Sequence, residues 1–192
     1  METLAENPVE KMNATLTTIF ERRAVRKYRN DPVPKAIIEK LLDAARMAPS
    51  AMNRQPWKFY VVTSKTVINT CAGQITKAAA GHYHLGLLSG IISKNYDVFH
   101  GAPVVIFITA PPGNEWAQLD TGMCAQNIML AAKSLGLDTC PVGFGRFIEE
   151  TEAAKALGIS KKEKVLLSIV IGYGNEKPEL HPRIKNNAVF ID

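Results

Sequence analysis

Basic side chains crowd one short stretch of this 192-residue chain, whose formal net charge at pH 7 is +5. The stretch contains Arg22, Arg23, Arg26, Lys27 and Arg29. Guanidinium groups carry forked N–H donors that match the oxygens of a phosphate. A duplex-binding surface would also need a reading helix or an aromatic-studded sheet, and the sequence contains neither pattern. The charge therefore favours a compact anionic ligand over a nucleic acid, with a solvated helix end as the alternative.

Motifs that place a catalytic side chain are absent from the sequence. It contains no GxGxxG after a strand, no GxxxxGK[ST], no HExxH and no GxSxG. His82 and His84 are spaced like metal ligands, but no Cys or acidic residue lies near them in sequence, so we predict no metal site. If the protein is an enzyme, a bound cofactor carries the chemistry.

Composition indicates an ordinary globular protein, with 46% hydrophobic and 21% charged residues. Its length fits one domain over residues 1–192. No apolar run reaches the roughly 20 residues of a membrane span, and the N-terminus lacks the pattern of a signal peptide, so we expect a cytoplasmic protein. The odd number of cysteines at these spacings predicts buried, reduced thiols at Cys71, Cys124 and Cys140.

Hydrophobic periodicity predicts alternating helices and strands. Helices are expected over residues 15–23, 34–48, 120–136 and 150–157, with an irregular helical region over 66–100. Leu16, Ile19 and Phe20 would form the inward face of the first helix. Strands are expected over residues 57–63, 104–109, 139–142 and 165–171. Because the second and fourth strands are too apolar to face water, the pattern predicts an α/β (α+β) fold with a mixed central sheet between two helical layers.

Two segments suggest association with a second copy of the chain. The helix over residues 120–136 is apolar on nearly every side, and Gly122 and Ala125 would permit close approach of another subunit. The tail after Gly174 ends in an apolar run over residues 188–191 that must pair with something. We therefore expect a homodimer that exchanges its C-terminal tails.

Two segments, residues 21–28 (ERRAVRKY) and 48–57 (APSAMNRQPW), together resemble the N-terminal signature of the nitroreductase family of FMN enzymes. The resemblance continues through residues 101–106, 120–136, 141–143, 169–174 and 182–185, and misses mainly residues 66–100. It implies a nitroreductase-like fold and an FMN-dependent oxidoreductase. Such an enzyme passes reducing equivalents from NADH or NADPH to a small organic acceptor, such as a nitroaromatic or a quinone, by a ping-pong cycle.

The same resemblance implies a set of cofactor-binding residues at the interface of a homodimer. The phosphate and the pyrimidine side of the flavin would be held by Arg22, Arg23, the backbone of Ala24 and Arg26. The partner subunit would supply Pro49, Ser50, Ala51 and Asn53. The strand end Pro141-Val142-Gly143 would lie where relatives place backbone N–H groups against the flavin ring, one of them near N5, and Arg183 and Lys185 would lie near the phosphate. Because the cofactor and the backbone supply the chemistry, no catalytic side chain, nucleic acid or membrane is implied.

The sequence departs from the family pattern at two places. Ala24 stands where relatives often have Ser, which removes a hydroxyl contact to the flavin. The middle region, which covers the flavin in relatives, is short, so the natural acceptor and the choice between NADH and NADPH are not predicted. Two alternatives stay open: a flavin-binding sensor or carrier without turnover, and a reductive dehalogenase or flavin-fragmenting enzyme of the same fold.

Overall fold

One antiparallel sheet forms the centre of the computed structural model, which describes residues 13–82, 96–184 and 187–191. Its strand order is β1-β2-β4-β3, and each neighbouring pair is antiparallel. The strands are β1 (Lys58–Val62), β2 (Val104–Ala110), β3 (Asp138–Val142) and β4 (Lys164–Gly172). An isolated parallel bridge between Ala24 and Thr139 lies on the free side of β3, outside the four antiparallel strands.

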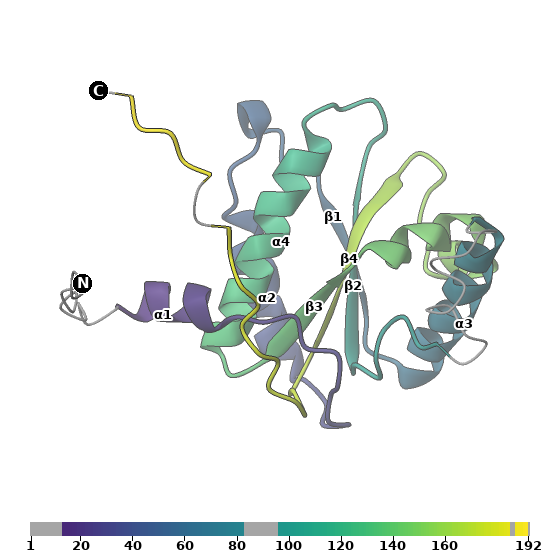
Figure 1. The fold of residues 1–192 in the computed structure, drawn as a ribbon. Coiled ribbons are helices and arrows are strands. Elements are labelled where there is room, and N and C mark those ends of the chain that lie inside the picture. The colour runs from purple at the N-terminus through teal and green to yellow at the C-terminus, as the bar shows by residue number, and fades with distance from the viewer. Residues whose placement is uncertain (1–12, 83–95, 185–186, 192) are drawn as a thin grey trace.

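Helices cover both faces of this sheet, which confirms the predicted layers (Figure 1). The α-helices are α1 (Ala14–Glu21), α2 (Lys35–Arg46), α3 (Lys65–His82), α4 (Ala117–Ser134) and α5 (Glu152–Ala156). Two 3-10 segments are η1 (Ala51–Asn53) and η2 (Gly143–Glu150). Helices α2 and α4 pack on one face, and α3 and η2 on the other.

Strand β2 separates the two hydrophobic cores of the protein. Every one of its residues is buried, because successive side chains point to opposite faces and a helical layer covers each face. Val104, Ile106 and Ile108 pack with α2 and α4, whereas Val105 and Phe107 pack with α3 and η2. The uninterrupted apolar run in the sequence is thus the middle of a covered sheet.

The predicted inward face of the first helix is wrong for the single subunit. Leu16, Ile19 and Phe20 are 43%, 43% and 60% exposed, and no residue of α1 is buried. The helix also ends at Glu21 rather than residue 23, because Arg22 adopts an extended conformation. Figure 1 shows α1 leading away from the body of the fold, where it contacts α4 only lightly.

Helix α4 corrects a second expectation. Ala125 is 1% exposed and packs with Ile128 in the core of its own subunit, so it cannot meet a second copy. Gly122 is exposed, and so is Leu119 at 56%. The helix therefore has one solvent-exposed side, which includes Leu119 and Gly122 but not Ala125. The three cysteines are free and buried, as predicted.

Among the described helices, none has the length and apolarity needed to cross a bilayer.

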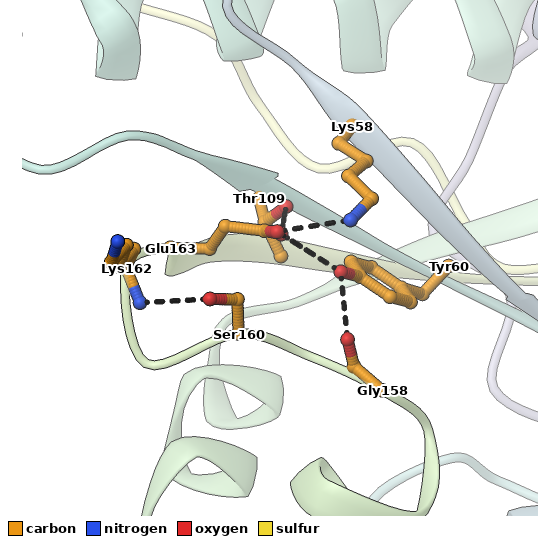
Figure 2. A network of polar contacts seen from close by, with 7 residues as sticks. All are labelled: Lys58, Tyr60, Thr109, Gly158, Ser160, Lys162 and Glu163. Atoms are coloured by element: carbon orange, nitrogen blue, oxygen red, sulfur yellow. Dashed lines mark hydrogen bonds and ion pairs between the residues drawn. The ribbon is translucent and has the colours of Figure 1, made fainter.

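The carboxylate of Glu163, the residue before β4, contacts side chains of β1 and β2 at one end of the sheet (Figure 2). It accepts hydrogen bonds from Lys58 Nζ at 3.0 Å, Tyr60 OH at 3.0 Å and Thr109 Oγ1 at 2.7 Å. Burial alone would raise the pKa of Glu163, but these hydrogen bonds and the charge of Lys58 hold it below its usual range. The charged form of Glu163 therefore stabilises the folded state.

Glu163→Gln should lower the free energy of unfolding at pH 7 by about 1 to 2 kcal/mol, since hydrogen bonds to a charged group exceed neutral ones by about that much. The folded-state pKa lies below the unfolded one, so the contribution is present above about pH 4.5 and is lost as the pH falls through the folded value. Urea unfolding should show a smaller difference in the free energy of unfolding between the wild type and Glu163→Gln at acid pH than at pH 7. Glu152→Gln, which removes an exposed ion pair with Lys155, is the matched control and should cost far less.

Candidate functional site

The basic segment, residues 22–29, lies along the free side of strand β3. Ala24 forms the parallel bridge with Thr139, and Val25 N donates to Thr139 O at 3.0 Å. The Val25 side chain is 2% exposed. One buried side chain and two backbone contacts thus fix the segment as an irregular outer strand of the sheet.

The chain after β4 holds the other side of this segment. Tyr28 and Gly174 form an antiparallel bridge, and Arg26 N donates to the Glu176 carboxylate at 2.5 Å. A Cβ atom on Gly174 would lie 2.4 Å from Asp138 Oδ2, so a larger residue would displace the Asp138 side chain. The basic segment is therefore clamped between β3 and residues 173–176.

The charges of Arg22 and Arg26 converge on strand β3 at Cys140. Burial raises the pKa of the Cys140 thiol, whereas the positive charges of Arg26 and Arg22 and a hydrogen bond with Arg26 oppose that rise. The net pKa of the thiol is raised, so it is protonated near neutral pH and is no nucleophile. The charges of Arg22 and Arg26 therefore act on Cys140, the residue before the predicted flavin-facing segment, residues 141–143.

Two other basic residues have local partners. Arg23 Nη1 donates to Phe20 O at 2.6 Å and to Arg22 O at 2.8 Å, and so caps the end of α1. Arg29 forms an ion pair with Asp31 at 3.0 Å and lies over the Tyr173 ring, 5.1 Å from its centroid. Arg22 and Arg26 are therefore the members of the predicted cluster whose charges reach β3.

Residues 141–143 present backbone at the end of β3. Pro141 and Gly143 are exposed, while Val142 is buried and accepts a hydrogen bond at its carbonyl from Ser168 Oγ at 2.8 Å. The chain then turns into η2, where a Cβ on Gly145 would lie 2.0 Å from Ser168 Oγ. The Ser168 hydrogen bond holds the end of β3, and the charges of Arg22 and Arg26 act on the neighbouring Cys140, an arrangement suited to a ligand with an anionic group.

The predicted loop over residues 49–53 lies elsewhere. Ala51 N donates to Asp120 Oδ1 at 3.1 Å, in the first turn of α4. Lys133, in the last turn of α4, pairs with Asp138 at 3.8 Å, next to the residue that Ala24 contacts. The 13 positions between Asp120 and Lys133 span about 20 Å of helix. Loop and basic segment therefore lie at opposite ends of α4 within one subunit, as Figure 1 shows.

The backbone of this loop is strained. Met52, Asn53 and Gln55 have φ angles of 54°, 55° and 44°, in the left-handed region that non-glycine residues rarely adopt. Ser50 Oγ accepts a hydrogen bond from Gln55 N at 2.9 Å and helps to hold the turn. Strained backbone concentrates at functional sites, where surrounding contacts enforce it.

The remaining predicted residues lie in the C-terminal tail. Arg183 is exposed and donates to His181 O at 2.8 Å, and Lys185 lies outside the described residues. His84 is also outside them. Within the described ranges, no group of three or more His, Cys, Asp or Glu side chains is arranged to hold a metal ion.

Sequence reasoning missed two acidic residues that organise these segments. Asp120 anchors the loop, and Glu176 anchors the basic segment at Arg26. An acidic residue inside the otherwise apolar sequence of α4 was the available signal for Asp120. Glu176 is 150 positions from Arg26 and gave no local signal.

Comparisons with known proteins show the family of this chain. The model of the Nitroreductase family matches residues 19–173, so the chain belongs to the nitroreductase family. It is 31% identical over 199 residues to nitrobenzene nitroreductase of Ectopseudomonas oleovorans, covering 84% of this chain and 87% of that protein.

Solved structures give the same result for the fold. An FMN-bound nitroreductase from Desulfitobacterium hafniense has a TM-score of 0.84 and 28% identity, covering 94% of this chain and 100% of that one. An FMN-bound nitroreductase from Bacteroides fragilis has a TM-score of 0.82 and 26% identity, covering 94% and 99%. The nitroreductase-like fold predicted from the sequence is confirmed.

Proposed function

We propose that this protein is a single-domain FMN-dependent oxidoreductase that passes reducing equivalents from NADH or NADPH to an organic acceptor, such as a nitroaromatic or a quinone, by a ping-pong cycle. The observation that carries the proposal is the pairing of the basic segment with β3 through Ala24 and Thr139, next to the predicted flavin-facing segment, residues 141–143, with the charges of Arg22 and Arg26 acting on Cys140. Membership of the nitroreductase family and the FMN in the two solved relatives support it.

The residues present fit FMN. The forked N–H donors of Arg22 and Arg26 would bind the phosphate and the electron-rich edge of the ring. The backbone of residues 141–143 would orient the ring, and Ala24 contributes backbone only. When bound, FMN accepts electrons from the nicotinamide and returns them to the second substrate. The chain's own part is to bind, orient and stabilise negative charge, which accounts for the absence of a catalytic side chain.

We propose further that two copies complete each site. Because about 20 Å of α4 separates Pro49, Ser50, Ala51 and Asn53 from the basic segment of the same chain, a loop that contacts the cofactor must come from another copy. Five partly or fully exposed apolar residues beside this loop, here called the α4 apolar surface, support a homodimer interface there: Met47, Met52, Trp116, Leu119 and Met123. Met123 and Leu119 line an open hollow with Pro49.

The C-terminal tail supports exchange between subunits. Ile184, Val189, Phe190 and Ile191 are 82%, 87%, 88% and 92% exposed, which is unfavourable for four large apolar side chains in water. Docking of the tail on the partner would bury them and bring Arg183 and Lys185 toward a cofactor.

The test is the visible spectrum of the purified protein under nitrogen, before and after NADH or NADPH. We expect flavin bands that bleach on addition of the nicotinamide and return with a quinone or nitroaromatic. Steady-state rates should give parallel double-reciprocal lines. Flavin that does not bleach would indicate a sensor or carrier, and a colourless protein with retained polynucleotide would contradict the proposal.

A further inference from the structure

The carboxylate of Asp120 is buried without full hydrogen bonding. Asp120 is 1% exposed, and its Oδ1 accepts a single hydrogen bond, from Ala51 N. Its Oδ2 has no hydrogen-bond partner in the part of the chain that the structure describes. Burying an incompletely paired carboxylate is costly, so its contribution to stability does not explain its presence.

We propose that Asp120 is a positioning residue for the reaction: its carboxylate holds the loop over residues 49–53 in the conformation that reaches the FMN of the partner subunit. The proposal rests on the shared site described under the proposed function. It adds a residue on α4 that has no contact with the cofactor of its own subunit.

The loop needs such an anchor because its own hydrogen bonds do not fix its place. Ser50 Oγ accepts from Gln55 N, and Asn53 N donates to Ser50 O at 2.9 Å, so both bonds lie within the loop. The bond from Ala51 N to Asp120 joins the loop to a helix 69 positions away in sequence. Asp120 therefore determines where the strained turn stands relative to the α4 apolar surface.

Three variants separate this role from a general structural one. Asp120→Ala removes the acceptor, whereas Asp120→Asn keeps an Oδ1 that can accept from Ala51 N. Ala51→Pro removes the donor and leaves Asp120 in place, and the extended backbone of Ser50 suits a following proline. Thr121→Val is the matched control, because Thr121 is also buried in the first turn and its Oγ1 has no partner among the described residues.

We expect Asp120→Ala and Ala51→Pro each to weaken FMN binding by about ten- to a hundredfold. Asp120→Asn should weaken FMN binding by less than about threefold, and Thr121→Val should bind FMN as tightly as the wild type does. Wild-type affinity in Ala51→Pro, or an Asp120→Asn variant as weak as Asp120→Ala, would overturn the proposal.

Heterodimers, isolated from co-expressed chains with different tags, decide whether the effect is exerted on the partner's site. An Arg22→Ala chain paired with an Asp120→Ala chain should regain one tight FMN per dimer, because one site then has both an intact basic segment and an intact loop. A dimer of Asp120→Ala with Ala51→Pro should regain none.

The reference is a heterodimer of Arg22→Ala with Ser50→Glu, which tests the shared site without Asp120. If the reference regains FMN and the Asp120→Ala pair does not, Asp120 acts within its own subunit and this inference alone fails. If the reference also fails to regain FMN, the shared site itself is wrong.

Discussion

Arg22→Ala should weaken FMN binding by about ten- to a hundredfold and should remove most of the protein's preference for FMN over riboflavin. A hydrogen bond to a charged group contributes about 1.5 to 3 kcal/mol, and about 1.4 kcal/mol corresponds to a factor of ten in Kd. The charges of Arg22 and Arg26 act on Cys140 in β3. Fluorescence titration with FMN and with riboflavin, at low and high salt, measures the effect, and FMN should bind less tightly as salt rises.

Lys27→Ala is the matched control, because Lys27 is an exposed cation of the same segment. At a specific site the two substitutions should weaken FMN binding unequally, whereas on a generally positive surface both effects would be small and similar. Equal affinity for FMN and riboflavin in the wild type, or no response to either Arg22→Ala or Arg26→Ala, would show that the segment is only a solvated run of charge.

Leu119→Glu should separate the dimer and release the cofactor together. Leu119 is 56% exposed and belongs to the α4 apolar surface, so a carboxylate there is tolerated in the monomer. In the dimer that carboxylate would be desolvated at a cost of several kcal/mol, and the Kd for association should rise roughly a hundredfold or more. As the protein concentration of this variant is lowered, the sedimentation coefficient and the flavin absorbance per chain should fall in parallel.

Val67→Glu places the same charge at a similarly exposed apolar position, 37% exposed on α3 over the opposite face of the sheet. It should leave association and FMN content unchanged. An unchanged dimer in Leu119→Glu would place the interface elsewhere, and a monomer with full FMN occupancy would refute the shared site.

The sequence predicted the two helical layers because β2 and β4 are covered on both faces, and such strands appear in the sequence as apolar runs. The buried face of helix α4 was harder to predict. Apolar residues occur on nearly every side of this helix, so their spacing does not indicate which side faces the core. Which of Leu119, Gly122 and Ala125 faces the core depends on how α4 packs on α2 and β4, and only the three-dimensional structure supplies that.

The basic segment shows the same limit at the level of single side chains. Its composition predicted an anion site, but which contacts each of its arginines makes depends on where α1 ends. Because α1 ends at Glu21, Arg23 can cap the helix, and the charge of Arg26 acts on Cys140 in β3. The contact between Arg26 and Glu176 joins residues 150 positions apart, and no local pattern encodes it.

The most direct test of the central claim, a site completed by two copies of the chain, is FMN binding by the Arg22→Ala and Ser50→Glu heterodimer. Each homodimer should lose most of its FMN, since both of its sites lack either the basic segment or a compatible loop. The heterodimer should bind one FMN per dimer with near wild-type affinity and show about half of the wild-type turnover, because one of its two sites is intact. A heterodimer as empty as the two homodimers would contradict the shared site.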